Sequence, residues 1–134
     1  MATLIAHIRV VEGGEARFEA IARNLFRISH DSEPALRRYE YWRGSEPRQY
    51  YTLIACDDFH GFLAHQTSAH HESAAPVLGE LIESLRIEWI DPVAGASDLP
   101  STRRQDLAAD ADELTRRYSE RFAAQIATWW LALR

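Results

Sequence analysis

Four histidines and the single cysteine lie close together in the middle of the chain, where they could serve as metal ligands, bases or a nucleophile. They are Cys56, His60, His65, His70 and His71. Zinc sites on helices use histidines four residues apart, whereas side chains five residues apart point about 140° away from each other. No nearby carboxylate or thiolate set completes four ligands at the expected spacing. We therefore expect no metal here, and we expect Cys56 to behave as a small buried apolar residue.

A second group of chemically capable residues begins on the first predicted strand. Residues 3–11 alternate, so that Leu4, Ala6 and Ile8 share one apolar face while His7 and Arg9 lie on the other. A histidine can act as a general base, and a fixed arginine can stabilise an anion in a dry site. Strand aromatic residues could stack on a planar ring: Tyr39, Tyr41, Trp42, Tyr51 and Trp89.

Each of these residues also has a purely structural interpretation. His7 could pack at a sheet interface with a satisfied hydrogen bond, and Arg9 could form an ion pair with a glutamate across a dimer interface. His65 and His70 could hydrogen-bond the backbone where a helix breaks and so fix the loop that covers a pocket. We expect His71 to be exposed.

The elements that position these residues follow from hydrophobic periodicity. The alternating or apolar segments predict strands, and the segments with helical spacing predict a first helix and a second helix that starts at Asp57 or Asp58. The predicted strands are residues 3–11, 35–43, 49–56 and 86–90, and the first helix is residues 15–29. The strand over residues 49–56 is apolar on both faces, which predicts a central position in the sheet.

The second helical region has a break at Thr67-Ser68, followed by a further helix. In that helix the inward-facing residues are expected to be Leu78, Leu81, Ile82 and Leu85. Pro76 is expected to be tolerable only in its first turn, because proline lacks the N–H that an interior helical position donates.

The resulting order, βαββαβ, predicts an α+β, ferredoxin-like fold with a four-stranded antiparallel sheet and helices on one side. The other face is too rich in large apolar residues to remain in water, which predicts a homodimer that encloses a cavity. We assign residues 1–93 to this domain, 94–105 to a linker and 106–134 to a helical extension. A long helix over 106–133 would pack Trp129-Trp130 on its own subunit, on the partner subunit or on another protein.

Composition restricts the classes of partner. The chain has 134 residues, a formal net charge of −5 and one cysteine. The negative charge provides no attraction to nucleic acid, and no apolar run is long enough to span a membrane. A single cysteine cannot form an intramolecular disulfide, which fits a cytoplasmic location.

Two short segments resemble the antibiotic biosynthesis monooxygenase family. Phe62, Ala64-His65 and Ser68-Ala69-His70 match that family's helix and loop in order and spacing, and residues 33–40 resemble its entry to the second strand. The resemblance covers roughly residues 3–93 and implies a dimeric α+β barrel. Family members include cofactor-independent monooxygenases of polyketide phenols and quinols, and a haem-degrading branch. Many members have Glu-x-Trp at the end of the third strand, where this chain has Ile54 and Cys56.

The resemblance implies a cofactor-independent monooxygenase that acts on a small aromatic, such as a quinol or a polyketide-type phenol, in the barrel cavity. The expected catalytic residues are His7, Arg9 and His70, and the expected substrate-binding residues are Tyr39, Trp42, Tyr51, His65 and Trp89. The alternative is a non-catalytic ligand-binding or interaction module on the same fold. Haem degradation ranks third, because the first strand offers no asparagine.

Overall fold

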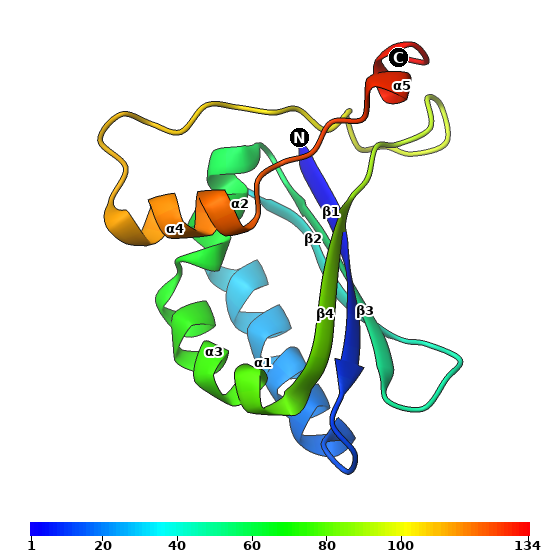
Figure 1. Cartoon of the computed structure of the whole chain (residues 1–134), viewed down its shortest axis with the longest axis vertical. Helices are drawn as coiled ribbons and strands as arrows, with labels where there is room; N and C mark the ends of the chain where they lie inside the picture. Colours follow the sequence, from blue (N-terminus) through cyan, green and yellow to red (C-terminus); the bar gives the residue numbers. More distant parts are fainter.

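The computed structural model describes residues 1–134 and contains one four-stranded antiparallel sheet (Figure 1). Its strand order is β2-β3-β1-β4, so β3 and β1 are central. This order and the antiparallel pairing confirm the ferredoxin-like prediction and the central position of the third strand. The strands are β1 (Ala2–Val10), β2 (Leu36–Arg43), β3 (Gln49–Cys56) and β4 (Ile82–Trp89).

Three helices cover one side of this sheet (Figure 1). The long helix α1 crosses between β1 and β2, and the pair α2 and α3 connects β3 to β4. We call the covered face of the sheet the helix side and the other face the open side. These helices are α1 (Glu15–Ser32), α2 (Phe59–Gln66) and α3 (Ala69–Leu81).

The strand register assigns each side chain to one of these sides. Leu4 pairs with Ile54, and both are buried on the helix side. His7 pairs with Tyr51 on one neighbour and with Arg86 on the other, so these three residues share the open side. The alternation predicted for residues 3–11 is confirmed, because the even-numbered residues of β1 are buried under the helices.

The break between α2 and α3 is confirmed, and side chains cap both helices. Asp58 Oδ1 accepts a hydrogen bond from Gly61 N at 2.7 Å at the start of α2. Ser68 caps α3, where its hydroxyl oxygen accepts from His71 N at 3.4 Å. The break therefore turns the chain between His65 and His70, and these two side chains no longer follow one helix axis.

Two expectations about α3 are wrong. Pro76 is the eighth residue of a helix that starts at Ala69, well beyond the first turn. Pro76 is exposed, so water can hydrogen-bond to the backbone carbonyl that the proline leaves without an N–H donor. The fourth strand starts at Ile82 instead of residue 86, so Ile82 and Leu85 belong to β4. Leu85 pairs with Ile8 on the helix side but remains 43% exposed, because β4 is an edge strand.

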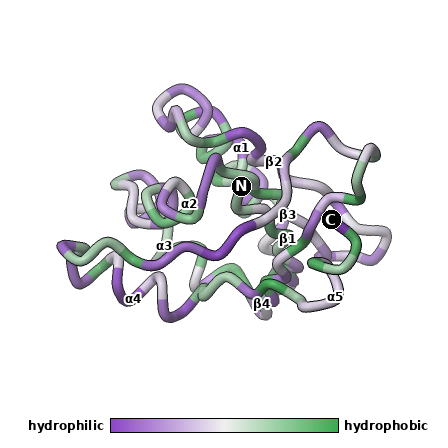
Figure 2. Tube along the Cα trace, turned by 90° about the horizontal axis from the view of Figure 1, so that it is seen from above, coloured by the Kyte–Doolittle hydropathy of each residue, from purple (hydrophilic) through white to green (hydrophobic).

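The long C-terminal helix predicted over residues 106–133 is also wrong. The structure has two short helices there, α4 (Glu113–Arg121) and α5 (Thr128–Leu131). Asp112 caps α4 through a 2.7 Å hydrogen bond to Thr115 N. In Figure 2 the trace through α4 is mainly hydrophilic, whereas hydrophobic residues gather at the C-terminal end beside α5.

Tertiary contacts explain why the C-terminal segment is not one helix. Arg103 N donates to Met1 O at 2.9 Å, and Gln105 Oε1 accepts from Phe59 N at 2.7 Å. These bonds hold residues 102–105 against the domain in a non-helical conformation. Helix α4 then packs against α2, where Phe122 contacts Phe62 edge-to-face with ring centroids 6.2 Å apart. The regularly spaced apolar residues that predicted one long helix therefore pack against the domain from shorter segments instead.

No helix of this chain combines the length and the apolar character that crossing a membrane requires.

Candidate functional site

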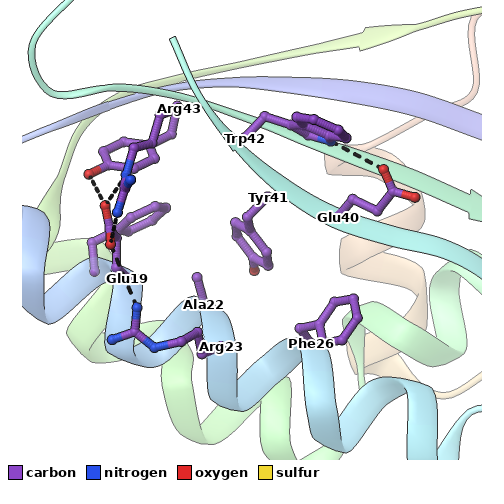
Figure 3. A pocket seen from close by; sticks show the side chains of 10 residues that line it. Glu19, Ala22, Arg23, Phe26, Glu40, Tyr41, Trp42 and Arg43 are labelled. Atoms are coloured by element: carbon purple, nitrogen blue, oxygen red, sulfur yellow. Dashed lines mark hydrogen bonds and ion pairs between the residues drawn. The ribbon is translucent and has the colours of Figure 1, made fainter.

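A groove of about 630 Å³ opens between α1 and the edge strand β2. Its lining combines five aromatic side chains with two carboxylates and two guanidinium groups. Figure 3 shows the Tyr41 ring in the middle of this groove, between Trp42 of β2 and Phe26 of α1. The lining residues are Phe18, Glu19, Ala22, Arg23, Phe26, Glu40, Tyr41, Trp42, Arg43 and Tyr50.

The position of β2 at the edge of the sheet explains this mixture. Tyr41 and Arg43 project from β2 toward the helix side, because they pair with Thr52 and Tyr50 of that face. Trp42 projects from the open side and is 59% exposed, yet it also lines the groove. An edge strand has no neighbour beyond it, so side chains from both faces can border the same opening.

One end of the groove carries a fixed charge pair. Arg43 Nε and Nη2 each donate to a different oxygen of Glu19 at 2.7 Å, and Tyr50 Oη donates to Glu19 Oε1 at 2.9 Å. These donors, Arg43 first and Tyr50 second, lower the pKa of Glu19 to about 2. Glu19 is therefore a fixed anion at neutral pH and is unsuited to accept a substrate proton.

The centre of the groove carries a neutral hydroxyl group. Tyr41 Oη lies 2.5 Å from Tyr39 Oη. Burial raises the pKa of Tyr41 to about 12 and the pKa of Tyr39 well above its ordinary value. Both phenols therefore remain protonated at neutral pH. When Tyr39 donates to Tyr41, the proton of Tyr41 is available to a molecule in the groove.

A buried polar cluster lies behind this tyrosine pair, and we call it the Glu33 cluster: Ser29, Glu33, His65, Ser68 and His70. Glu33 Oε2 lies 2.8 Å from His65 Nδ1, and Glu33 Oε1 lies 2.6 Å from His70 Nε2. The hydroxyl oxygens of Ser29 and Ser68 lie 3.0 and 3.1 Å from the same His70 nitrogen. Tyr39 joins the cluster to the groove, because its ring meets His65 edge-to-face at 4.5 Å.

Glu33 is ionised in this cluster. Burial raises the pKa of its carboxyl group, but hydrogen bonds and charge from His65 and then His70 outweigh this effect. The net result is a pKa below the ordinary value of 4.5. A carboxylate that accepts from two histidines holds the ends of three helices together.

The geometric argument against a metal site is wrong for His65 and His70. Their ligand atoms and a Glu33 oxygen all lie within 4.8 Å of one another. The helix break brings the two rings together, and the carboxylate comes from the end of α1, more than thirty residues away. The argument from spacing assumed one continuous helix and considered only carboxylates close in sequence.

The prediction that His71 is exposed is wrong. His71 Nδ1 is buried without a hydrogen-bond partner, and so is His65 Nε2 on the neighbouring ring. The two ring centroids are 5.2 Å apart. Burial, followed by the charge of His65, lowers the pKa of His71 to about 4, so this ring is neutral at physiological pH.

The remaining predicted site residues do not gather in one place. His7 Nε2 lies 3.0 Å from Glu88 Oε2 and 2.8 Å from Arg86 Nη2 on the open side. Arg9 is exposed on the same side. Trp89 is buried in the helix-side core, with its ring centroid 5.3 Å from that of Phe62.

The eight predicted residues thus form an open-side group and a helix-side group. The open-side group is His7, Arg9, Trp42 and Tyr51, and the helix-side group is Tyr39, His65, His70 and Trp89. The predicted catalytic roles of His7, Arg9 and His70 stay predictions. Sequence reasoning missed Glu19, Glu33 and Arg43. Only Glu33 had a signal, because it begins the family-like segment over residues 33–40.

The fold and this site lead to a comparison with known families. A model of the antibiotic biosynthesis monooxygenase family matches residues 1–77, which is more than half of the chain. The chain belongs to this family. The match ends within α3, so it includes the groove and every member of the Glu33 cluster. No curated protein has detectable sequence similarity to this chain.

Solved structures share the fold of this family member at low sequence identity. PA3566 from Pseudomonas aeruginosa is 21% identical with a TM-score of 0.64, and the match covers 69% of this chain and 94% of that one. A Bacteroides thetaiotaomicron protein named for the same family is 13% identical with a TM-score of 0.68, covering 73% and 94%. Rv0793 from Mycobacterium tuberculosis is 15% identical with a TM-score of 0.64, covering 72% and 98%.

Proposed function

We propose that this protein is a monooxygenase that oxidises a small phenol or quinol in the groove between α1 and β2, without flavin or a catalytic metal. One observation supports this location above all. The groove of about 630 Å³ is lined by aromatic rings, and the hydroxyl of Tyr41 lies at its centre. Such a volume suits a small planar ligand, and the aromatic walls can stack on it. Family membership supports the reaction type.

The reaction balances without an external reductant. A phenol whose para carbon carries hydrogen reacts with O₂ to give a para-quinone and water. One oxygen atom enters the ring, and the other leaves as water with the two hydrogens lost from the ring carbon and the hydroxyl group. The substrate supplies all four electrons that reduce O₂. The protein must bind the phenol, stabilise its anion and keep oxygen beside the ring.

The residues of the groove suit an acidic phenol. Glu19 is held by Arg43, whereas Glu40 has only Trp42 Nε1 as a side-chain partner, at 3.2 Å. Glu40 is therefore the carboxylate of the groove that can accept the phenol proton. Tyr41 then donates to the phenolate, as a fixed donor stabilises charge that develops in a water-poor site. A phenol that ionises near neutral pH needs the least help from Glu40.

The test compares two tyrosines from the two sides of one sheet. Tyr41→Phe removes the groove hydroxyl, whereas Tyr51→Phe removes an open-side hydroxyl next to His7. We expect Tyr41→Phe to lower kcat/KM for oxidation of a phenol with a free para position about 100-fold, the loss typical of removing one donor to a developing anion. We expect Tyr51→Phe to change it little. Oxygen consumption should equal quinone formation, with no hydrogen peroxide.

Equal activity of the Tyr41→Phe variant and the wild type would remove this hydroxyl from the mechanism. Absence of oxygen uptake above background with a panel of phenols and quinols would favour the second candidate function, a non-catalytic binding module. Ile54 and Cys56, in place of the Glu-x-Trp of many members, favour that alternative. Mixing the protein with hemin tests the third candidate, since haem binding shifts the Soret band.

We also propose that the open side is the interface of a homodimer. Ile5 and Leu53 are only half-buried in the single subunit, and Trp42 is 59% exposed. The C-terminal segment does not compete for this face, because α4 packs against α2 on the helix side. Burial of these apolar side chains provides the driving force for association. Analytical ultracentrifugation at micromolar concentration tests this proposal, and a single-subunit mass would contradict it.

A further inference from the structure

The Glu33 cluster combines side chains from three separate elements at one point. Glu33 is the C-cap residue that follows α1, His65 lies in the last turn of α2, and His70 lies in the first turn of α3. Their ligand atoms all lie within 4.8 Å of one another. We propose that these three residues form a binding site for one divalent transition-metal ion of the Zn²⁺ type, a site that goes beyond the proposed oxidation.

The donor set matches such an ion. Two imidazole nitrogens and a carboxylate oxygen are ligands that Zn²⁺ takes at about 2.0 to 2.2 Å, and three protein ligands leave a fourth position for water. Two neutral histidines and one carboxylate place one negative charge against the two positive charges of the ion. The present nitrogen–oxygen distances of 2.6 and 2.8 Å show that the groups already converge.

Burial and access are both suitable for an ion. The His65 side chain is fully buried, while Glu33 and His70 keep 14% and 16% of their side chains exposed. The buried ligand limits competition from water, and the partly exposed ligands give the ion a route from solvent. The hydroxyl groups of Ser29 and Ser68 lie 3.0 and 3.1 Å from His70 Nε2 and provide nearby polar groups for a bound water.

Two unpartnered polar atoms lie beside the proposed site. Coordination through His65 Nδ1 leaves the proton of that ring on Nε2, which is buried and unpartnered. His71 Nδ1 is likewise buried and unpartnered, and its ring centroid is 5.2 Å from that of His65. Metal-bound histidines generally donate their second N–H to a hydrogen-bond acceptor, and the unpartnered His71 Nδ1 belongs to the ring that packs against His65.

The consequence is structural. An ion at this point would join α1, α2 and α3 behind Tyr39, which separates it from the groove. We therefore expect metal binding to raise the thermal midpoint, as any ligand that binds only the folded state does. The proposal does not depend on oxidation, so binding and quinol turnover are measured separately, with and without chelator.

Co²⁺ is the probe, because its visible absorption reports the ligand geometry directly. The chelator-treated protein is titrated with Co²⁺, and Zn²⁺ is then added as a competitor. We expect one equivalent of Co²⁺ to bind, Zn²⁺ to displace it, and Glu33→Gln or His70→Asn to weaken binding about 100-fold. His60→Ala is the matched control, since His60 is an exposed histidine of α2, and it should bind as the wild type does.

Circular dichroism checks that each variant folds, and His70→Asn, which changes a partly exposed side chain, provides the comparison if Glu33→Gln does not fold. The absence of a Co²⁺ spectrum at a large excess of the ion would overturn the proposal. Equal binding by the wild type and by both folded ligand variants would overturn it as well, and so would loss of binding in His60→Ala.

Discussion

The two sides of the sheet carry polar residues in different ways. On the helix side, Glu33, His65 and His70 are largely buried and joined by short hydrogen bonds. On the open side, His7, Arg86 and Glu88 form an ion-pair group whose side chains are 30%, 62% and 49% exposed. The first group is held by the packing of three helices, whereas the second is free to rearrange or to meet another molecule.

This difference supports the two proposals made above for the two sides of the sheet. Buried polar groups are costly unless every partner is in place, so they stay fixed and can position a reactive groove. Exposed ion pairs contribute little to stability but can adapt to a partner surface. In the proposed function the chemistry lies on the helix side, and in the proposed dimer the contact between subunits lies on the open side.

The largest expected effect comes from removing the acceptor on the helix side. Glu33→Ala leaves the N–H groups of His65 and His70 without their carboxylate partner. Breaking a buried pair in this way typically costs about 3 to 5 kcal/mol of unfolding free energy. Urea denaturation measures this loss. Glu88→Ala is the matched change on the open side and should leave the unfolding midpoint nearly unchanged, because both partners there face water.

A similar loss in both variants would contradict the distinction between the two sides. Comparable stability of Glu33→Ala and the wild type would show that the cluster does not hold the helices together.

The second effect is a pH dependence of stability that arises on the helix side. Burial lowers the pKa of His71 from 6.5 to about 4, and the charged or titratable groups around it are His65, Glu72, Glu33 and His70. Because the unfolded chain binds a proton on His71 below pH 6.5 and the folded chain does not, stability falls as pH decreases toward 4. We expect His71 to account for about 3 kcal/mol of this loss.

Unfolding free energies at the two ends of this pH range measure the effect. His71→Gln should reduce the difference, whereas His60→Gln, on the exposed surface of α2, should leave it intact. An identical pH dependence in His71→Gln and the wild type would show that His71 is solvated in the folded protein.

The smallest expected effect concerns the residues first predicted to be catalytic. His7→Ala and Arg9→Ala change the open side, away from the groove. If the groove is the site of oxidation, kcat/KM in the oxygen-uptake assay should change less than about twofold, while the dimer should weaken. A tenfold loss of turnover with an intact dimer would instead support a cavity between subunits and the predicted roles of His7 and Arg9.

The fold could be predicted well because local patterns determine it. Alternation assigned Leu4 to the helix side and His7 to the open side, Asp57 or Asp58 indicated the start of the second helix, and the break at Thr67-Ser68 was predicted. The prediction of one long C-terminal helix is wrong for a physical reason. Spacing of apolar residues records which residues are buried, and Phe122 is partly buried against the core from a helix that ends at Arg121.

The candidate site was less predictable, because it depends on contacts that are distant in sequence. Tyr39 and Tyr41 could be placed on the same strand face, but their proximity to Glu33 and α1 comes only from the packing of helices on the sheet. On one continuous helix, the side chains of His65 and His70 would point away from each other. The turn at Ser68 instead lets both side chains hydrogen-bond to Glu33. Periodicity predicts on which face of a strand or helix a side chain lies, but it does not predict which residue of the neighbouring layer that side chain contacts.

The most direct test is a structure of the protein with a bound quinone product. We predict that the quinone lies between α1 and β2 in the groove, with one carbonyl oxygen within about 3 Å of Tyr41 Oη, the length of an ordinary hydrogen bond. A quinone bound on the open side beside His7 and Arg9, with the groove free, would contradict the assignment of chemistry to the helix side.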